Sequence, residues 1–306
     1  MRFLPLLLAA TMNTAPGLLL GQTFQDGADA YEAGDYKAAF EIFEPLAEGG
    51  NADALNALGF MRYNGLGVPQ NYAEAVKWYQ LAAKQGDAWA QNNIGAMYHN
   101  GLGVPQDYAE AVRWYRLAAD QGVAMAEFNL GLMYDHGKGV AQDYTEAFQW
   151  YRLAAEQGYA LAQNHLGLMY DQGKGVPQDY TEAAKWYLLA VEQGYALAQF
   201  NLGLMYEHGK GVPQDDAEAV KLYRLAAAQG DASAQFNLGL MYLYGEGVNR
   251  NFTNAYILLY LAAAQIEDAR EDREIVEKKL TPSQLAGAQR LLSEWKVGET
   301  LPLQGG

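Results

Sequence analysis

The stretch DAWAQNNIGAMYHNGLGVPQDYAEAVRWYRLAADQG, from Asp87 to Gly122, decides the fold, because the chain repeats it with a 36-residue period and without a slip. Its closing glycine and its Met-Tyr pair both return in phase. The glycines are Gly86, Gly122, Gly158, Gly194 and Gly230. The pairs are Met97-Tyr98, Met133-Tyr134, Met169-Tyr170, Met205-Tyr206 and Met241-Tyr242. A sustained period of this length is the signature of a solenoid of stacked repeats.

Each repeat predicts two amphipathic helices. In the first, apolar residues recur at i, i+4, i+7 and i+8 from Ala90 onward. The turn Gly101–Pro105 ends it, because glycine suits a left-handed cap and proline blocks any continuation. Asp107 then caps the second helix, and Glu110 stands three residues on, as in an acidic capping box. One repeat is therefore expected to be helix, glycine-rich turn, helix and tight turn.

A glycine also stands inside every first helix, where it costs about 1 kcal/mol relative to alanine. These glycines are Gly59, Gly95, Gly131, Gly167, Gly203 and Gly239. We expect each to admit a bulky aromatic ring of the second helix, from the column that contains Trp114 or the column that contains Tyr115.

The pattern A-x-x-x-LG-x-MY-x-x-G-x-GV-P-x-D-x-x-x-A-x-x-WY-x-x-AA-x-x-G resembles the Sel-one-like repeat, a relative of the tetratricopeptide repeat with a longer turn between its helices. The resemblance covers Asn51 to about Ile266. It implies an all-α fold, a right-handed α/α superhelical solenoid of helix-turn-helix repeats. It also implies an adaptor or scaffold for other proteins, of a kind that occurs in bacteria as secreted or periplasmic proteins.

The chain divides into five predicted segments. They are a signal peptide at 1–21, a tetratricopeptide-like capping helix pair at 22–50, six repeats at 51–266, C-terminal capping helices at 267–297 and a flexible tail at 298–306. Cleavage is expected between Gly21 and Gln22, which would place the mature protein in the periplasm or outside a bacterial cell. The alternative is an uncleaved membrane anchor, for which the uninterrupted apolar run is too short.

The net charge and composition of the chain limit the classes of partner that it can bind. The formal net charge of −15 repels phosphate, so nucleic acid and anionic membranes are poor partners, and we expect no stable membrane insertion after signal cleavage. A protein or peptide with apolar and basic residues is the better fit. The chain has no cysteine, hence no disulfide or thiolate metal site, and its four histidines lie in different columns or distant repeats. We predict no metal, no cofactor and no catalytic residue.

The residues opposite the packing face of the first helices form the candidate binding groove. The predicted set is Trp89, Asn92, Asn93, Phe128, Asn129, Leu132, Asp135, Asn164, His165, Leu168, Asp171, Phe200, Asn201, Leu204, Glu207, Phe236, Asn237 and Leu240. Phenylalanines and leucines are expected to be exposed there, as at an interaction site. The asparagines would form a ladder of amides for the backbone of an extended segment. In the alternative arrangement, the asparagines bond to the neighbouring helix and the phenylalanines pack between repeats.

These features predict an exported adaptor that binds a protein segment in a concave groove. An alternative is an enzyme or binding factor for cell-envelope glycan or β-lactams, as the resemblance to some relatives implies. The carboxylates Asp135, Asp171 and Glu207 would stand roughly 10 Å apart from helix to helix, near the separation in inverting glycosidases. Each has a lysine three residues on, however, and this regular repetition is typical of solvated charge. We therefore predict that the protein is not an enzyme.

Overall fold

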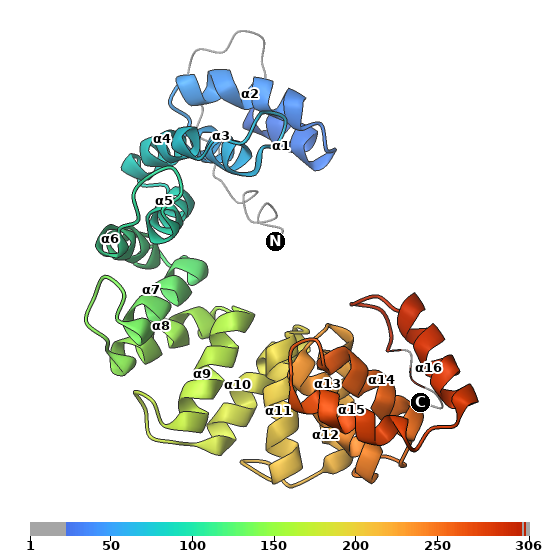
Figure 1. The fold of residues 1–306 in the computed structure, drawn as a ribbon. Coiled ribbons are helices and arrows are strands. Elements are labelled where there is room, and N and C mark those ends of the chain that lie inside the picture. Colours follow the sequence, from blue (N-terminus) through green and yellow to red (C-terminus); the bar gives the residue numbers. More distant parts are fainter. Residues whose placement is uncertain (1–22, 302, 304–306) are drawn as a thin grey trace. The chain divides into compact units, whose positions relative to one another are not determined.

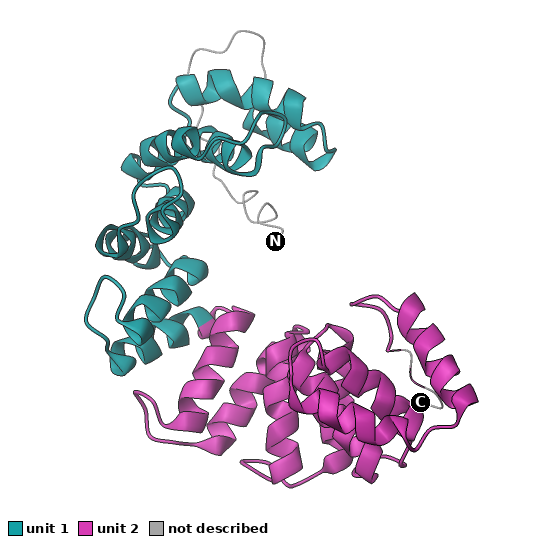
Figure 2. Cartoon of the chain, in the orientation of Figure 1, with its two compact units in different colours: residues 1–154 teal, residues 155–306 magenta. Residues whose placement is uncertain are grey.

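The computed structural model describes residues 23–301 and 303. This part of the chain contains sixteen α-helices and no strand, so the all-α prediction is confirmed. Two compact units divide the chain: Met1–Ala154, here the N-terminal unit, and Ala155–Gly306, here the C-terminal unit (Figures 1 and 2). The boundary falls in the last turn of helix α8. The predicted signal peptide lies outside the described residues.

Within each unit the helices form successive pairs, each with a first and a second helix. The first helices are α1 (Phe24–Glu32), α3 (Ala52–Asn64), α5 (Ala88–Asn100), α7 (Ala124–His136), α9 (Ala160–Gln172), α11 (Ala196–His208) and α13 (Ala232–Tyr244). The second helices are α2 (Tyr36–Glu48), α4 (Tyr72–Lys84), α6 (Tyr108–Ala119), α8 (Tyr144–Glu156), α10 (Tyr180–Glu192), α12 (Asp216–Ala228) and α14 (Phe252–Ala262). Helices α15 (Asp268–Glu277) and α16 (Pro282–Glu294) follow the last pair.

The two glycines of the turn inside a helix pair, such as Gly101 and Gly103, have different structural roles. Gly101 has φ 67°, in the left-handed region, and its N–H donates to the carbonyl of Met97, so it ends α5 as predicted. Gly103 has φ 72° and lies against the preceding second helix, where a Cβ would come 2.4 Å from the carbonyl oxygen of Tyr72. The second glycine therefore lets each turn touch the pair before it.

Of the capping box predicted for α6, the Asp107 cap bond is present, and the reciprocal bond from the Glu110 side chain is replaced by an ion pair. The Asp107 carboxylate accepts a hydrogen bond from the Glu110 N–H at 3.0 Å. The Glu110 carboxylate pairs with Arg113 at 3.0 Å. The complete reciprocal box occurs where threonine is the cap, at Thr23 and Thr281.

The glycines inside the first helices admit the tyrosine column. A Cβ on Gly95 would lie 2.8 Å from the ring of Tyr115, and one on Gly167 would lie 2.7 Å from the ring of Tyr187. These tyrosines belong to the second helix of the same pair and are buried. The prediction of a close aromatic approach is confirmed, and the ring beside each of these glycines comes from the tyrosine column.

The C-terminal end covers the last pairs. The N–H of Gly298 donates to the carbonyl of Ala228 at 2.8 Å, and Leu301 and Leu303 pack against the apolar core of the C-terminal unit. The segment expected to be a flexible tail therefore contacts the solenoid over its described part. Among the described helices, none is both long enough and apolar enough to cross a membrane.

Candidate functional site

The predicted groove residues all lie on the first helices: those of the N-terminal unit on α5 and α7, and those of the C-terminal unit on α9, α11 and α13. We call this surface the first-helix stripe and consider it separately in each unit. Because the repeat period is constant, equivalent side chains occupy equivalent turns of successive helices.

The asparagines of the stripe pair with one another from helix to helix. Each pair joins residues 37 positions apart, with the later amide Nδ2 donating to the earlier Oδ1. The pairs are Asn93 to Asn56 at 3.1 Å, Asn129 to Asn92 at 3.0 Å and Asn201 to Asn164 at 3.0 Å. The acceptors Asn56, Asn92 and Asn164 are buried. The proposed ladder of free amides is therefore wrong for these residues, because their amide nitrogens hold neighbouring first helices together.

Phenylalanine replaces the acceptor asparagine in three repeats, at Phe128, Phe200 and Phe236, and after Phe200 the later amide, that of Asn237, has a different partner. Phe128 is 5% exposed and its ring centroid lies 5.5 Å from that of Tyr151 in its own pair. Phe200 is half-buried, with its centroid 5.8 Å from that of Tyr223. Asn237 donates to the Tyr223 hydroxyl at 3.3 Å, in place of the missing asparagine.

The predicted exposure of the phenylalanines therefore needs a correction. Phe128 is buried beside a tyrosine ring, while Phe200 and Phe236 are half-buried and pack against the C-terminal core. Asn92 and Asn164 are buried too, so they also cannot contact a partner directly. His165 remains half-buried and its Nδ1 lies 3.0 Å from the Leu161 carbonyl oxygen of its own helix.

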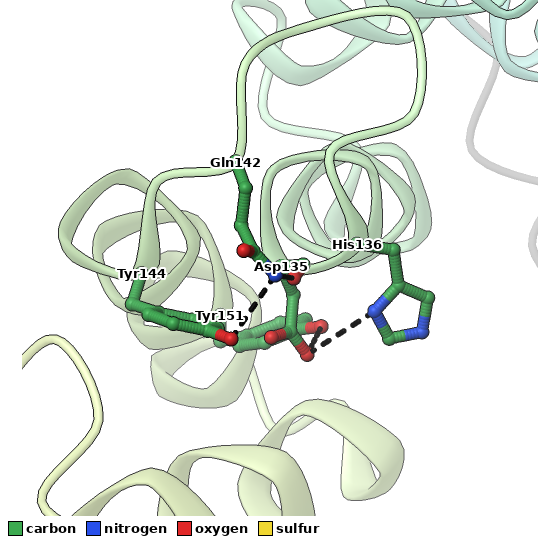
Figure 3. A network of polar contacts seen from close by, with 5 residues as sticks. All are labelled: Asp135, His136, Gln142, Tyr144 and Tyr151. Carbon is green, nitrogen blue, oxygen red and sulfur yellow. Dashed lines mark hydrogen bonds and ion pairs between the residues drawn. The ribbon is translucent and has the colours of Figure 1, made fainter.

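The acidic residues of the stripe lie against the buried tyrosines (Figure 3). The Asp135 carboxylate accepts from the Tyr151 hydroxyl at 3.4 Å and lies 3.7 Å from Nδ1 of His136. The Asp135 carbonyl accepts from Nε2 of Gln142 at 2.7 Å, and the same nitrogen donates to the Tyr144 hydroxyl at 3.0 Å. This network fixes the carboxylate at the end of α7.

The same arrangement recurs in the C-terminal unit. The Tyr223 hydroxyl donates to the Glu207 carboxylate, so Asn237, Tyr223 and Glu207 form a chain of hydrogen bonds. Burial raises the pKa of Asp171, and the charge of Lys210 opposes this shift. Burial also raises the pKa of Tyr187, and the charge of Asp171 adds to that rise. The tyrosines therefore remain neutral donors, and the acidic side chains stay half-buried at the edge of the stripe.

The lysines that follow these acids are not simply solvated. The ammonium of Lys138 lies 5.4 Å from the ring centroid of Tyr108, and that of Lys210 lies 5.6 Å from the centroid of Tyr180. Each lysine thus contacts the preceding second helix by a cation–π interaction. Within the residues that the structure describes, no group of three histidine or carboxylate side chains could hold a metal ion.

The leucines of the stripe are partly accessible, as are Phe200 and Phe236, and Leu204 and Leu240 likewise pack against the C-terminal core. Leu132 in the N-terminal unit is half-buried, as are Leu168, Leu204 and Leu240 in the C-terminal unit. Leu197 of α11 is among the exposed large apolar side chains, and Trp89 of α5 is half-buried. In the C-terminal unit, the stripe is thus a partly exposed apolar strip edged by Asp171 and Glu207.

The sequence analysis did not identify a column of buried glutamines on the first helices. Gln91 is buried, and its Nε2 donates to the Ala83 carbonyl at 3.3 Å while its Oε1 accepts from Gln121 at 2.7 Å. Equivalent bonds hold Gln163, Gln199 and Gln235. Glu127 occupies the same position in its repeat and is 4% exposed. The signal in the sequence was a column with glutamine in four of the six repeats, a carboxylate in one and Leu55 in the first.

These features define a helical repeat protein in which most buried polar groups of the first helices fix the register of the repeats. Comparison with known families matches the Sel1 repeat over residues 18–51, 52–87, 90–123, 124–159, 160–195, 196–231 and 232–266. The chain belongs to the Sel1 repeat family. The first matched segment overlaps the helix pair α1–α2, and the last one ends where the sequence predicted the repeats to end.

Solved structures agree with this assignment. A Sel1 repeat protein from Oxalobacter formigenes is 37% identical with a TM-score of 0.72, over 79% of this chain and 96% of that one. The protein c5321, a protective antigen present in uropathogenic Escherichia coli strains and displaying an SLR fold, is 35% identical with a TM-score of 0.58, over 91% of this chain and 69% of that one. The comparison with curated proteins gave no match. Sel1 repeat proteins generally mediate protein–protein interactions, and the family is typically a non-enzymatic scaffold.

Proposed function

We propose that this chain is an exported, non-enzymatic adaptor that binds a segment of another protein on the first-helix stripe of its C-terminal unit. The observation that carries the proposal is the strip of partly exposed Leu168, Leu204 and Leu240 with Asp171 and Glu207 at its edge. Apolar groups left accessible beside charge are typical of an interaction site. Export rests on the composition of residues 1–21.

The chemistry of the stripe favours a segment with apolar and basic side chains. Apolar groups of the segment would cover the leucines, and lysine or arginine would pair with the carboxylates of Asp171 and Glu207. Since Asn201 is already bonded to Asn164, selectivity comes from the leucines and the acidic edge more than from amide contacts with the segment's backbone.

The test uses two sets of short synthetic peptides, one rich in leucine and arginine and one with glutamate in place of arginine. We expect the basic set to bind the wild-type protein and the acidic set to fail. Leu204→Asp should weaken binding of the basic set about tenfold or more, since it replaces an apolar contact with a charge. Asp171→Asn should weaken it less, and added salt should reduce the contribution of Asp171.

Leu225→Asp is the matched control, because Leu225 is exposed on the second helix α12 of the same unit. Circular dichroism of each variant shows whether the solenoid remains folded. Equal binding by the wild-type protein and a folded Leu204→Asp variant would show that the stripe is not the site. Export is tested separately, by the appearance of the full-length chain and a chain lacking residues 1–21 in the periplasmic or culture fraction.

A further inference from the structure

Helix α10 carries an exposed stripe that no contact within the described chain covers. Lys185, Leu188, Leu189 and Glu192 stand at i, i+3, i+4 and i+7, so they lie on one side of the helix. All four side chains are exposed, and the two leucines are 48% and 40% accessible. This α10 stripe is on a second helix and is separate from the first-helix stripe.

Comparison with the other repeats shows what is particular to α10. The leucine column continues at Leu81, Leu117, Leu153 and Leu225, each of which is exposed. The preceding residue, however, is Arg116 in α6 and Arg224 in α12. Those guanidinium groups donate to the hydroxyls of Tyr134 and Tyr242 in the following pair and lie over their rings. Leu188 cannot make this bond, and among the second helices that the structure describes only α10 has two adjacent exposed leucines at these positions.

The order of residues on the stripe is self-complementary. In the sequence Lys-x-x-Leu-Leu-x-x-Glu, from Lys185 to Glu192, the two leucines lie at the centre and a charged residue lies at each end. The two end charges are opposite in sign. A two-fold axis between Leu188 and Leu189 would therefore set the leucines of two antiparallel helices against each other. It would also place Lys185 of each copy opposite Glu192 of the other. An interface of this isologous kind uses the same surface on both subunits.

We propose that the α10 stripe binds a second copy of this chain in this antiparallel arrangement. Lys185 contacts Glu182 on its own helix at 2.5 Å, and the two side chains are 63% and 37% exposed. Such an exposed pair contributes little, so Lys185 can exchange it for Glu192 of the second copy. One helix pair buries less than the roughly 1,200–2,000 Å² of a stable interface, so the dimer is weak and depends on concentration.

The first experiment measures the sedimentation of the full chain over a range of concentrations. We expect a reversible monomer–dimer equilibrium in the wild-type protein. Leu188→Arg restores the residue type of the neighbouring repeats, so it should fold and yet weaken the dimer about tenfold or more. Leu117→Arg is the matched control on α6, because Leu117 is also 48% exposed, and it should leave the equilibrium unchanged.

The second experiment tests the antiparallel register by charge. Lys185→Glu and Glu192→Lys should each weaken self-association, because like charges would then face each other across the axis. A mixture of these two variants should recover the dimer, and so should a chain carrying both changes. A wild-type protein that stays monomeric throughout overturns the proposal, as does a dimer that Leu188→Arg leaves intact or that ignores the charge exchanges. None of these measurements involves the peptide site, so the two proposals fail independently.

Discussion

Replacing Gly167 of α9 by alanine tests whether the glycines inside the first helices exist to admit the tyrosine column. The new Cβ would lie 2.7 Å from ring carbons of Tyr187 and 3.2 Å from the carbonyl oxygen of Ala183. Tyr187 is fully buried, so neither its ring nor the α10 backbone can move without disturbing the core. Overpacking of this kind costs about 1–3 kcal/mol. The higher helix propensity of alanine stabilises the folded protein by about 1 kcal/mol and offsets part of this cost.

We therefore expect a net loss of up to about 2 kcal/mol for Gly167→Ala, which corresponds to a fall in Tm of a few degrees for a domain of this size. Two matched variants calibrate the result. Gly287→Ala on α16 meets no atom within 4 Å and should stabilise by about 1 kcal/mol. Gly239→Ala faces Leu259 at 3.0 Å in place of a tyrosine and should fall between the two.

Urea and thermal unfolding followed by circular dichroism give the order of the three variants. The reasoning is refuted if Gly167→Ala stabilises the protein as much as Gly287→Ala does, because the glycine would then have no packing role.

Two further predictions use the polar residues of the stripe. Asn201→Ala should lower stability by about 1–3 kcal/mol in urea unfolding, because it leaves Oδ1 of the buried Asn164 without its donor. Asp171→Asn should stabilise at neutral pH. Since burial raises the folded-state pKa of Asp171 above its unfolded value, the folded protein takes up the proton first as pH falls. The advantage of Asp171→Asn should therefore shrink as pH falls from neutral through the folded pKa, and Tm measured against pH for both proteins would show no such trend if the argument is wrong.

The helix pairs could be predicted from the sequence because their signals are local. Asp107 marks the start of α6 and Gly101 the end of α5 within a few residues of the chain, and the period multiplies each signal over the repeats. The close approach at Gly95 was also predictable, since a glycine kept inside a helix against its propensity needs a steric reason. The partner ring was ambiguous between two columns, and only the packing of the pair selects Tyr115.

The polar pairs of the stripe could not be predicted in the same way, because they depend on how adjacent repeats are aligned. A helical wheel places Asn93 opposite the packing face of its own pair, yet the preceding first helix covers part of that side through Asn56. The prediction that Phe128 is exposed failed because its ring packs against the ring of Tyr151 in the same helix pair. The sequence did contain a signal 37 residues apart: an asparagine is followed by an asparagine at this separation in three places.

The pairing of asparagines 37 residues apart limits which groups of the first-helix stripe can contact a partner. Where the earlier residue is asparagine, as at Asn164, the later amide is bound to it; where the earlier residue is Phe200, the amide of Asn237 turns to a tyrosine hydroxyl. In both cases one of the two amide hydrogens is used within the solenoid, which leaves a ligand only the other one. At the proposed site, recognition would therefore depend mainly on the partly accessible leucines and on the half-buried carboxylates of Asp171 and Glu207. The proposed function then predicts that a partner is selected by where its apolar and basic side chains fall along the repeat period, and that a segment of the same composition without that spacing binds poorly.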